Sequence, residues 1–195
     1  MKTDKRDARA LCDACHLGAF RRSHRSSDES RLLRKHLDQL ALVDKKVAEA
    51  VKDDERVQRL TTVPSVGPVT AATFIAIVDD VGRFVSSHKL QSYVGLVPRE
   101  YSSGEKQQRG HITKAGNNRL RVVWVECAWG ILGRSDPQSE PLEKWATRIA
   151  ERRGKRIAAV ALARKLAGIL FAMTKNARSF EPDRLGVDSQ GRFTE

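Results

Sequence analysis

Apolar side chains recur every three or four residues along most of the chain, whereas the strict alternation of apolar and polar residues that is typical of strands is scarce. This pattern predicts helices over residues 3–17, 28–51, a stretch that ends near 60, a stretch that starts near 68, 86–94, 117–132, 142–152 and 157–174. We therefore expect a mainly α fold. It would consist of a helical extension with a coiled-coil-like helix, followed by a C-terminal domain that contains a helix-hairpin-helix.

The helix predicted from residue 28 carries an apolar seam. Asp28 can cap its first turn. The seam alternates steps of four and three residues, as in a coiled coil, and has one polar position: Leu33, Leu37, Leu40, Asp44, Val47 and Val51. It spans few heptads, so a plain amphipathic helix is an equal alternative.

Two prolines flank a glycine in the segment VPSVGPV. A helix ends near Leu60, Gly67 lies in the turn, and Pro68 suits the first turn of a second helix. In a helix-hairpin-helix, the turn glycine lets backbone N–H groups approach a phosphate, and the second helix adds positive potential. Gly67 is therefore a candidate nucleic-acid contact, with a buried helical hairpin that binds no ligand as the alternative.

The stretch REYSSGEKQQRGHITKAGNNRLR, residues 99–121, has six cationic residues, two acidic ones and three glycines. Such a composition predicts an exposed loop that meets an anion. Ser103, which directly precedes a glycine, and Ser102 are candidate nucleophiles toward a phosphodiester if cations stabilise the developing charge. A plain turn is the alternative. The candidate nucleic-acid contacts of this stretch are Arg99, Lys106, Arg109, Lys114, Asn117, Arg119 and Arg121.

The overall charge also favours an anionic partner. The chain contains 36 Lys and Arg against 24 Asp and Glu, a net charge of +12. Nucleic acid is the first candidate partner, an anionic membrane surface the second, and a basic protein that binds neither is the third. Arg152 and Arg153, with Lys155 and Arg156, form a second basic cluster that either contacts phosphates or is a solvated turn.

The N-terminal residues and the number of cysteines indicate the cellular compartment. The segment MKTDKRDARA is polar and lacks the apolar core of a signal peptide, and no apolar run is long enough to span a membrane. Three cysteines, an odd number, favour a reducing compartment. We expect a cytoplasmic protein. The segment CDACH formally matches a haem-attachment pattern, but that attachment needs export; a zinc site would need further ligands.

Asp4 and Asp7 lie three residues apart and would share one face of a helix. Paired carboxylates can hold Mg²⁺ beside a phosphate. The alternative is a charged first helical turn, where acidic residues are favoured by the helix dipole.

Four segments resemble one known family: KTDKRDARAL, LTTVPSVGPVTAATFIAIVDDVGRF, LQSYVGLVPREYSSGEKQQRGHITKAGNNRLR and AVALARKLAGILFAM. They are similar, in the same order, to the insertion-sequence transposases of the DEDD type with a C-terminal serine domain. The pilin-inversion recombinase is a relative of that family. The middle segments, with GLVP, SSG and ITKAGNNRLR, are the most specific.

The resemblance implies a function in DNA transposition or recombination. It implies Ser103 as the nucleophile, with Ser102 in reserve, and Asp4 and Asp7 as the last two of four acidic Mg²⁺ ligands. It also implies DNA and a structured guide RNA as partners, and a homo-oligomer in which acidic and serine half-sites meet. No membrane is implied.

The resemblance further suggests an N-terminally truncated member, because the first acidic pair of the family should lie well upstream of Asp4. The expected domains are a remnant of the resolvase-like catalytic domain (1–27), a coiled-coil-like connector (28–57), the serine transposase domain (58–178) and a flexible tail (179–195). We hypothesise that this chain binds DNA but does not transpose alone. A non-catalytic nucleic-acid-binding module is the alternative, and a helical scaffold that ignores nucleic acid is a third class.

Overall fold

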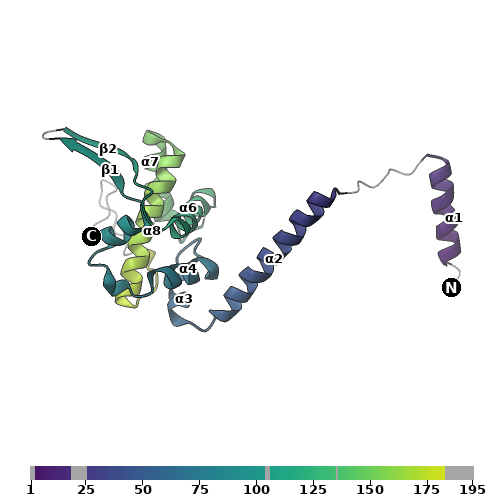
Figure 1. Cartoon of the computed structure of the whole chain (residues 1–195), viewed down its shortest axis with the longest axis horizontal. Helices are drawn as coiled ribbons and strands as arrows, with labels where there is room; N and C mark the ends of the chain where they lie inside the picture. The colour runs from purple at the N-terminus through teal and green to yellow at the C-terminus, as the bar shows by residue number, and fades with distance from the viewer. Residues whose placement is uncertain (1–2, 19–25, 104–105, 135, 183–195) are drawn as a thin grey trace. The chain divides into compact units, whose positions relative to one another are not determined.

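The chain is mainly helical, which confirms the predicted fold class. The structure, a computed structural model, describes residues 3–18, 26–103, 106–134 and 136–182, with the backbone alone for residues 3–7, 11, 101–103 and 106–109. The elements, in chain order (Figure 1), are α1 (Thr3–His16), α2 (Asp28–Ala50), α3 (Glu55–Leu60), α4 (Pro68–Val78), the 3₁₀ helix η1 (Val81–Arg83), α5 (Ser87–Val94), β1 (Pro98–Ser103), β2 (Lys106–Ile112), α6 (Asn118–Gly133), α7 (Glu140–Arg153) and α8 (Lys155–Asn176).

The chain divides into two compact units, residues 1–43 and 44–195. The predicted helix ends differ from the observed ones by at most two residues. The predicted domain limits at residues 27, 57 and 178 stay predictions, and residues 183–195 of the predicted tail lie outside the described residues. Phe180, near the start of that tail, packs against the core, and its N–H donates to Thr62 Oγ1 (2.9 Å).

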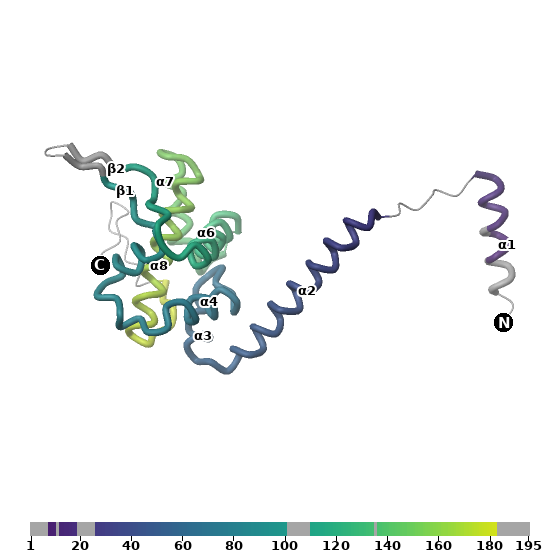
Figure 2. The backbone as a smooth tube through the Cα atoms, viewed as in Figure 1, coloured from purple at the N-terminus to yellow at the C-terminus, as the bar shows by residue number. Residues whose placement is uncertain are grey.

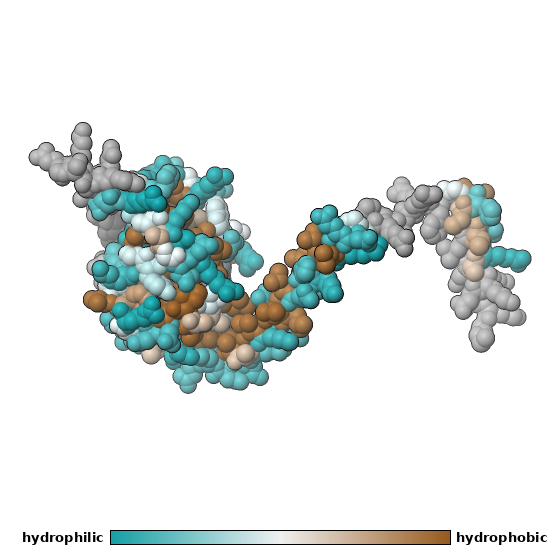
Figure 3. All heavy atoms as spheres, in the orientation of Figure 1, coloured by the Kyte–Doolittle hydropathy of each residue, from teal (hydrophilic) through white to brown (hydrophobic). Residues whose placement is uncertain are grey.

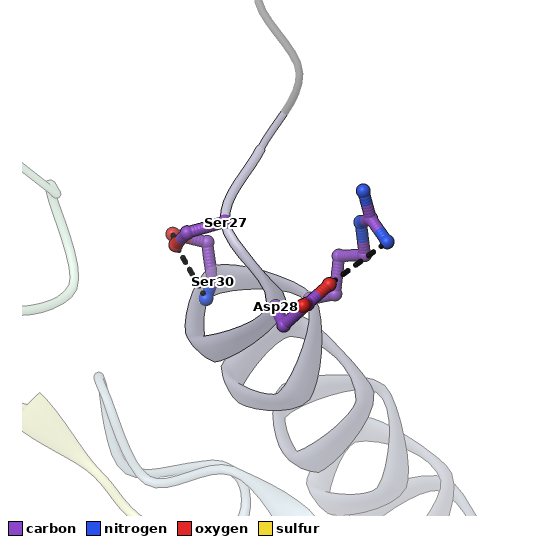
Figure 4. Close-up of polar contacts among 4 residues, drawn as sticks. Ser27, Asp28 and Ser30 are labelled. Carbon is purple, nitrogen blue, oxygen red and sulfur yellow. Dashed lines mark hydrogen bonds and ion pairs between the residues drawn. The ribbon is translucent and has the colours of Figure 1, made fainter.

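The N-terminus of α2 is capped by Ser27 rather than by Asp28, so the predicted cap was wrong by one residue. Ser27 Oγ accepts from the backbone N–H of Ser30 (3.2 Å), as Figure 4 shows. Asp28 instead lies in the first turn and pairs with Arg31 (3.0 Å). Ser27 is the cap because a cap oxygen must reach the N–H three residues ahead. Asp28, in the first turn, is still stabilised by the helix dipole.

The apolar seam of α2 is exposed. No residue of the helix is buried, and Leu33, Leu37 and Leu40 expose 58%, 64% and 61% of their surface. Figure 3 shows apolar residues along this helix. Water-exposed leucines in this number are unfavourable in an isolated helix, because burying each one would stabilise it by about 1.5–3 kcal/mol.

The core of the second unit is built around α8. This helix packs against α3, α5, α6 and α7, and Figure 2 traces it through the helical body. Leu162, Leu166 and Leu170 are fully buried, and buried alanines between them let neighbouring helices approach closely. Trp124 of α6 lies against Phe74 of α4, with ring centroids 5.9 Å apart. The core therefore joins helices that lie before the hairpin in the chain, α3 to α5, with helices that follow it, α6 to α8.

By length and composition, α8 could cross a membrane, and among the described helices it alone passes this test. Half of the apolar window is buried inside the structure. A core helix of a folded domain passes the same test, so its composition is explained by packing.

The segment predicted as a loop is, in its first half, an antiparallel hairpin. Strand β1 pairs with β2, from Pro98 opposite Ile112 to Ser103 opposite Lys106, with a bulge between Pro98 and Glu100. Figure 1 shows the hairpin extending from the helical body. The loop prediction was wrong because the strands are polar on both faces, so they lack the apolar alternation by which strands are recognised.

Candidate nucleic-acid interface

The turn between α3 and α4 places Gly67 at the N-cap of α4. Its φ is −88°, its cap position has no side-chain hydrogen bond, and Pro68 follows as the first helical residue. A Cβ added at Gly67 would meet no atom within 4 Å. The first N–H groups of an α-helix lack intrahelical partners, so this end of α4 presents open donors and the positive end of the helix dipole.

Asp54 fixes the helix on the other side of this turn. Its carboxylate caps α3 by accepting the N–H of Arg56 (2.8 Å) and pairs with the Arg56 guanidinium (2.7 Å). The guanidinium hydrogen bond, aided by the backbone N–H, lowers the pKa of Asp54 to about 2, and the same pair raises the pKa of Arg56. Because the folded-state pKa is depressed, the stabilisation is present above the ordinary pKa near 3.8 and is lost as the pH falls toward 2.

Cys127, on the buried side of α6, is held as a neutral thiol. Its Sγ lies 3.8 Å from Thr70 Oγ1 of α4. Burial raises the pKa of the thiol, which opposes ionisation. This cysteine therefore joins α4 to α6 and is a poor nucleophile.

The base of the hairpin is closed by a set of backbone hydrogen bonds. Thr113 N–H donates to Val97 O (2.9 Å), and Lys114 N–H donates to Gly95 O (3.1 Å). Asn117 N–H donates to Tyr93 O (3.0 Å), which joins the start of α6 to the end of α5. Gly95 and Gly116, at φ values of +74° and +121°, make the two reversals that allow this closure. We call residues 93–97 and 113–117 the hairpin base.

Both glycines mark helix ends in the sequence: Gly95 directly follows an apolar helical stretch, and Gly116 directly precedes another. Glycine at such helix ends is typical of left-handed backbone, which side chains other than glycine adopt at a cost.

The predicted cations of this region differ in what they contact. Arg119 and Lys114 are exposed, and no hydrogen bond or ion pair is assigned to either side chain among the described residues. Lys114 has a φ of +55°, unusual for a lysine. Arg99 is exposed but donates from Nη2 to Thr113 O (3.3 Å).

Asn117 and Arg121 are engaged inside the protein. Asn117 caps α6, with its Oδ1 accepting the N–H of Leu120 (3.0 Å). Arg121 donates from Nη1 to Val94 O (2.6 Å) and from Nη2 to Asn118 Oδ1 (2.8 Å). Both residues therefore support the hairpin base, and their predicted contacts with nucleic acid stay predictions.

The two candidate serines occupy the end of β1. Ser103 pairs with Lys106 and Ser102 with Gln107, and Glu100 pairs with Arg109. The predicted nucleophile therefore lies across the ladder from one of the predicted cations. The side chains of Ser102, Ser103, Lys106 and Arg109 are outside the described part of the structure, so their chemistry stays a prediction.

The second basic cluster lies where α7 turns into α8 around Gly154, whose φ is +89°. Arg152, Arg153, Lys155 and Arg156 are all exposed. Arg152 Nε donates to Arg148 O (3.3 Å), which leaves the rest of its guanidinium open. This turn presents positive charge to solvent without an assigned ion pair among the described residues.

The predicted magnesium ligands Asp4 and Asp7 lie in α1. Their side chains are outside the described part. The described residues contain no group of three or more His, Cys, Asp and Glu placed to hold a metal ion. Two carboxylates supply fewer hard oxygen ligands than Mg²⁺ takes, so these residues fit part of such a site, and the magnesium prediction stays a prediction.

These features define a basic helical domain from which a β-hairpin extends. Residues 57–142, from α3 to the first turn of α7, match the family described as "Transposase IS116/IS110/IS902 family". This part of the chain is therefore similar to the transposases of that family. The predicted resemblance is confirmed at this level; the DEDD type, the serine domain and the truncation stay predictions.

Three transposases are similar to most of the chain. A "Probable family 20 transposase" of Pseudomonas aeruginosa is 30% identical over 143 residues, 73% of this chain and 42% of that protein. The transposase for insertion sequence element IS1328 of Yersinia enterocolitica is 34% identical, over 73% of this chain and 43% of that protein. The transposase for IS1111A of Coxiella burnetii is 37% identical, over 70% and 36%. The chain thus spans less than half the length of these relatives.

Proposed function

We propose that this chain is the DNA-binding, serine-bearing part of a transposase that acts in DNA transposition or recombination. The family match carries this proposal, because residues 57–142 include the α3–α4 turn, the hairpin with its paired serines and the start of α6. The names of the relatives support the same class of reaction. A non-catalytic nucleic-acid-binding module is the second candidate, favoured by the excess of exposed cations.

DNA would be held by phosphate contacts from three places: the N-terminus of α4 at Gly67, the exposed Lys114 and Arg119, and the basic turn between α7 and α8. Backbone N–H groups at a helix N-terminus and exposed Lys or Arg side chains are the usual donors to phosphate oxygens. Such contacts position DNA without reading its sequence. Binding therefore has to weaken as salt rises.

Salt dependence tests this proposal. We expect the chain to bind duplex DNA in a gel-shift assay, and Arg119→Gln to lower the slope of log affinity against log salt by about one unit. The matched control is Lys144→Gln, since Lys144 is exposed but paired with Glu140 (2.7 Å) on α7 and should leave the slope unchanged. Binding that is absent, or insensitive to salt, would place the chain in the class of helical scaffolds.

Gly67→Ala is a second test, because it separates function from folding at the α3–α4 turn. The added methyl group meets open space and the φ of −88° suits alanine. Because alanine is a poorer N-cap than glycine, we expect the melting temperature to fall by no more than about 2–4 °C. If the glycine admits a phosphate to the backbone, DNA affinity should fall about five- to tenfold. Equal affinity of the alanine variant and the wild type would leave a helical hairpin that contacts no ligand.

The serine would act as a nucleophile. Its oxygen forms a bond to a DNA phosphorus, and the bond from phosphorus to the departing strand oxygen breaks. The serine hydroxyl proton is released to solvent, and the departing oxygen takes up a proton from solvent. The product is a phosphoserine link. Lys106, opposite Ser103 in the ladder, is the nearest predicted cation by register and would stabilise the developing charge.

Magnesium and the partners complete the proposal. Asp4 and Asp7 would contribute to a Mg²⁺ site, and the ion would polarise a phosphate. A structured guide RNA is a further proposed partner, on the family resemblance. Oligomer formation is supported by the exposed seam of α2, because pairing Leu33, Leu37 and Leu40 with a second copy would bury them.

A further inference from the structure

We propose that Arg121 is a positioning residue that locks the hairpin base between α5 and α6, rather than a phosphate contact. Its relevance to catalysis rests on the proposed function, since the locked hairpin is the one that carries Ser103. The locking itself concerns only the described residues of the base.

Arg121 bridges two helices with two charged hydrogen bonds. Nη1 donates to Val94 O, the carbonyl of the last residue of α5, at 2.6 Å, and Nη2 donates to Asn118 Oδ1 at 2.8 Å. Carbonyl groups in the last turn of a helix have no intrahelical partner, and a cation there also complements the helix dipole. Arg121 is half-buried, and its charged guanidinium is a stronger hydrogen-bond donor to this carbonyl group than a neutral side chain of α6 would be.

The backbone around the guanidinium is shaped to admit it. A Cβ added at Gly95 would lie 2.9 Å from Arg121 Nη1 and would also meet the carbonyl of Ala115. Gly95 O accepts from Lys114 N–H, so the residue that leaves room for the arginine also joins the two legs of the hairpin. Removing the guanidinium would therefore leave the hairpin base without the side chain that packs against Gly95.

Arg119, two residues earlier on α6, provides the contrast. It is exposed and makes none of the assigned bonds of the described residues, whereas Arg121 is turned inward. The two residues have the same side chain but different contacts. Phosphate contact therefore falls to Arg119, and support of the hairpin falls to Arg121.

Amide hydrogen exchange and DNA binding on the full chain distinguish the two roles. For Arg121→Gln we expect exchange in β1 and β2 to accelerate about tenfold or more, with amides of α8 unchanged and the salt slope of DNA binding unchanged. Arg119→Gln should leave exchange in β1 and β2 unchanged and should lower the salt slope of DNA binding. Arg121→Lys should restore part of the protection, because one amine reaches one acceptor, and Asn118→Ala should cause a smaller acceleration because it removes one bond.

Hairpin exchange in Arg121→Gln that equals the wild type would overturn the proposal, and so would a salt slope that falls by about one unit as in Arg119→Gln. Uniform acceleration that includes α8 would also contradict it, since that would indicate a role in global stability, and the Asn118→Ala variant checks this with a milder change. If the wild-type chain fails to bind DNA, the proposed function fails, while the exchange measurements still decide whether Arg121 locks the base.

Discussion

Replacing Gly116 with alanine is expected to destabilise the 44–195 unit by about 3 kcal/mol or more. Gly116 has a φ of +121°, a region that alanine adopts only under strain, and its Cβ would be driven into the carbonyl group of Tyr93, with the carbonyl carbon 2.9 Å away. That carbonyl cannot retreat cheaply, because it accepts the N–H of Asn117 at the start of α6. Relief of the clash would open the hairpin base.

Urea unfolding followed by circular dichroism measures this loss. Gly133→Ala is the matched control: Gly133 is exposed at the end of α6, and its Cβ would meet nothing within 4 Å. Alanine should be neutral there or stabilise the helix by up to about 1 kcal/mol. If Gly116→Ala were as stable as Gly133→Ala, the described closure of the hairpin base would be wrong.

Replacing Ser103 with alanine is expected to abolish covalent attachment of the chain to DNA. The assay mixes the chain with a full-length family member and labelled DNA, then separates covalent products on a denaturing gel. An adduct formed by this chain is recognised by its protein mass of 21.8 kDa, because the curated relatives are longer and therefore heavier. Under the proposed mechanism, this substitution removes the oxygen that forms the phosphoserine link, so no adduct should form.

Ser102→Ala is the control for Ser103→Ala. The two serines occupy consecutive positions of β1, and consecutive positions of a strand belong to opposite faces, so only one should serve as the nucleophile. We expect Ser102→Ala to retain the adduct. The opposite outcome would assign the nucleophile to Ser102, and an adduct that forms in neither the wild type nor the variants would favour a non-catalytic binding module.

Most helices could be predicted from the sequence because each depends on residues close in the chain. Pro68 begins α4, Gly95 ends α5 and Asn117 caps α6, all as the local chemistry indicates. Trp124, Cys127 and Ile131, spaced at three and four residues, are all buried on one side of α6. The cap of α2 was misplaced by one residue, since serine and aspartate are similar caps and stand side by side.

The hairpin could not be predicted in the same way. Its strands have neither apolar alternation nor a favourable composition, and they form because the hairpin base brings residues 95–97 against 113–114. The candidate site was predicted in part. The segment and its charge were evident, but which of its polar residues face inward was not.

The mainly α fold, the basic character and the family resemblance follow from the amino-acid sequence alone, because periodicity, charge and short motifs are properties of neighbouring residues. How similar residues divide their roles depends on the folded structure. Arg121 meets Val94 O across 27 positions, and buried Gln91 meets Arg164 of α8 across 73. Such pairs depend on how the helices pack. An arginine side chain can be solvated on either face of its helix, and it turns inward where packing places a carbonyl group without a partner beside it.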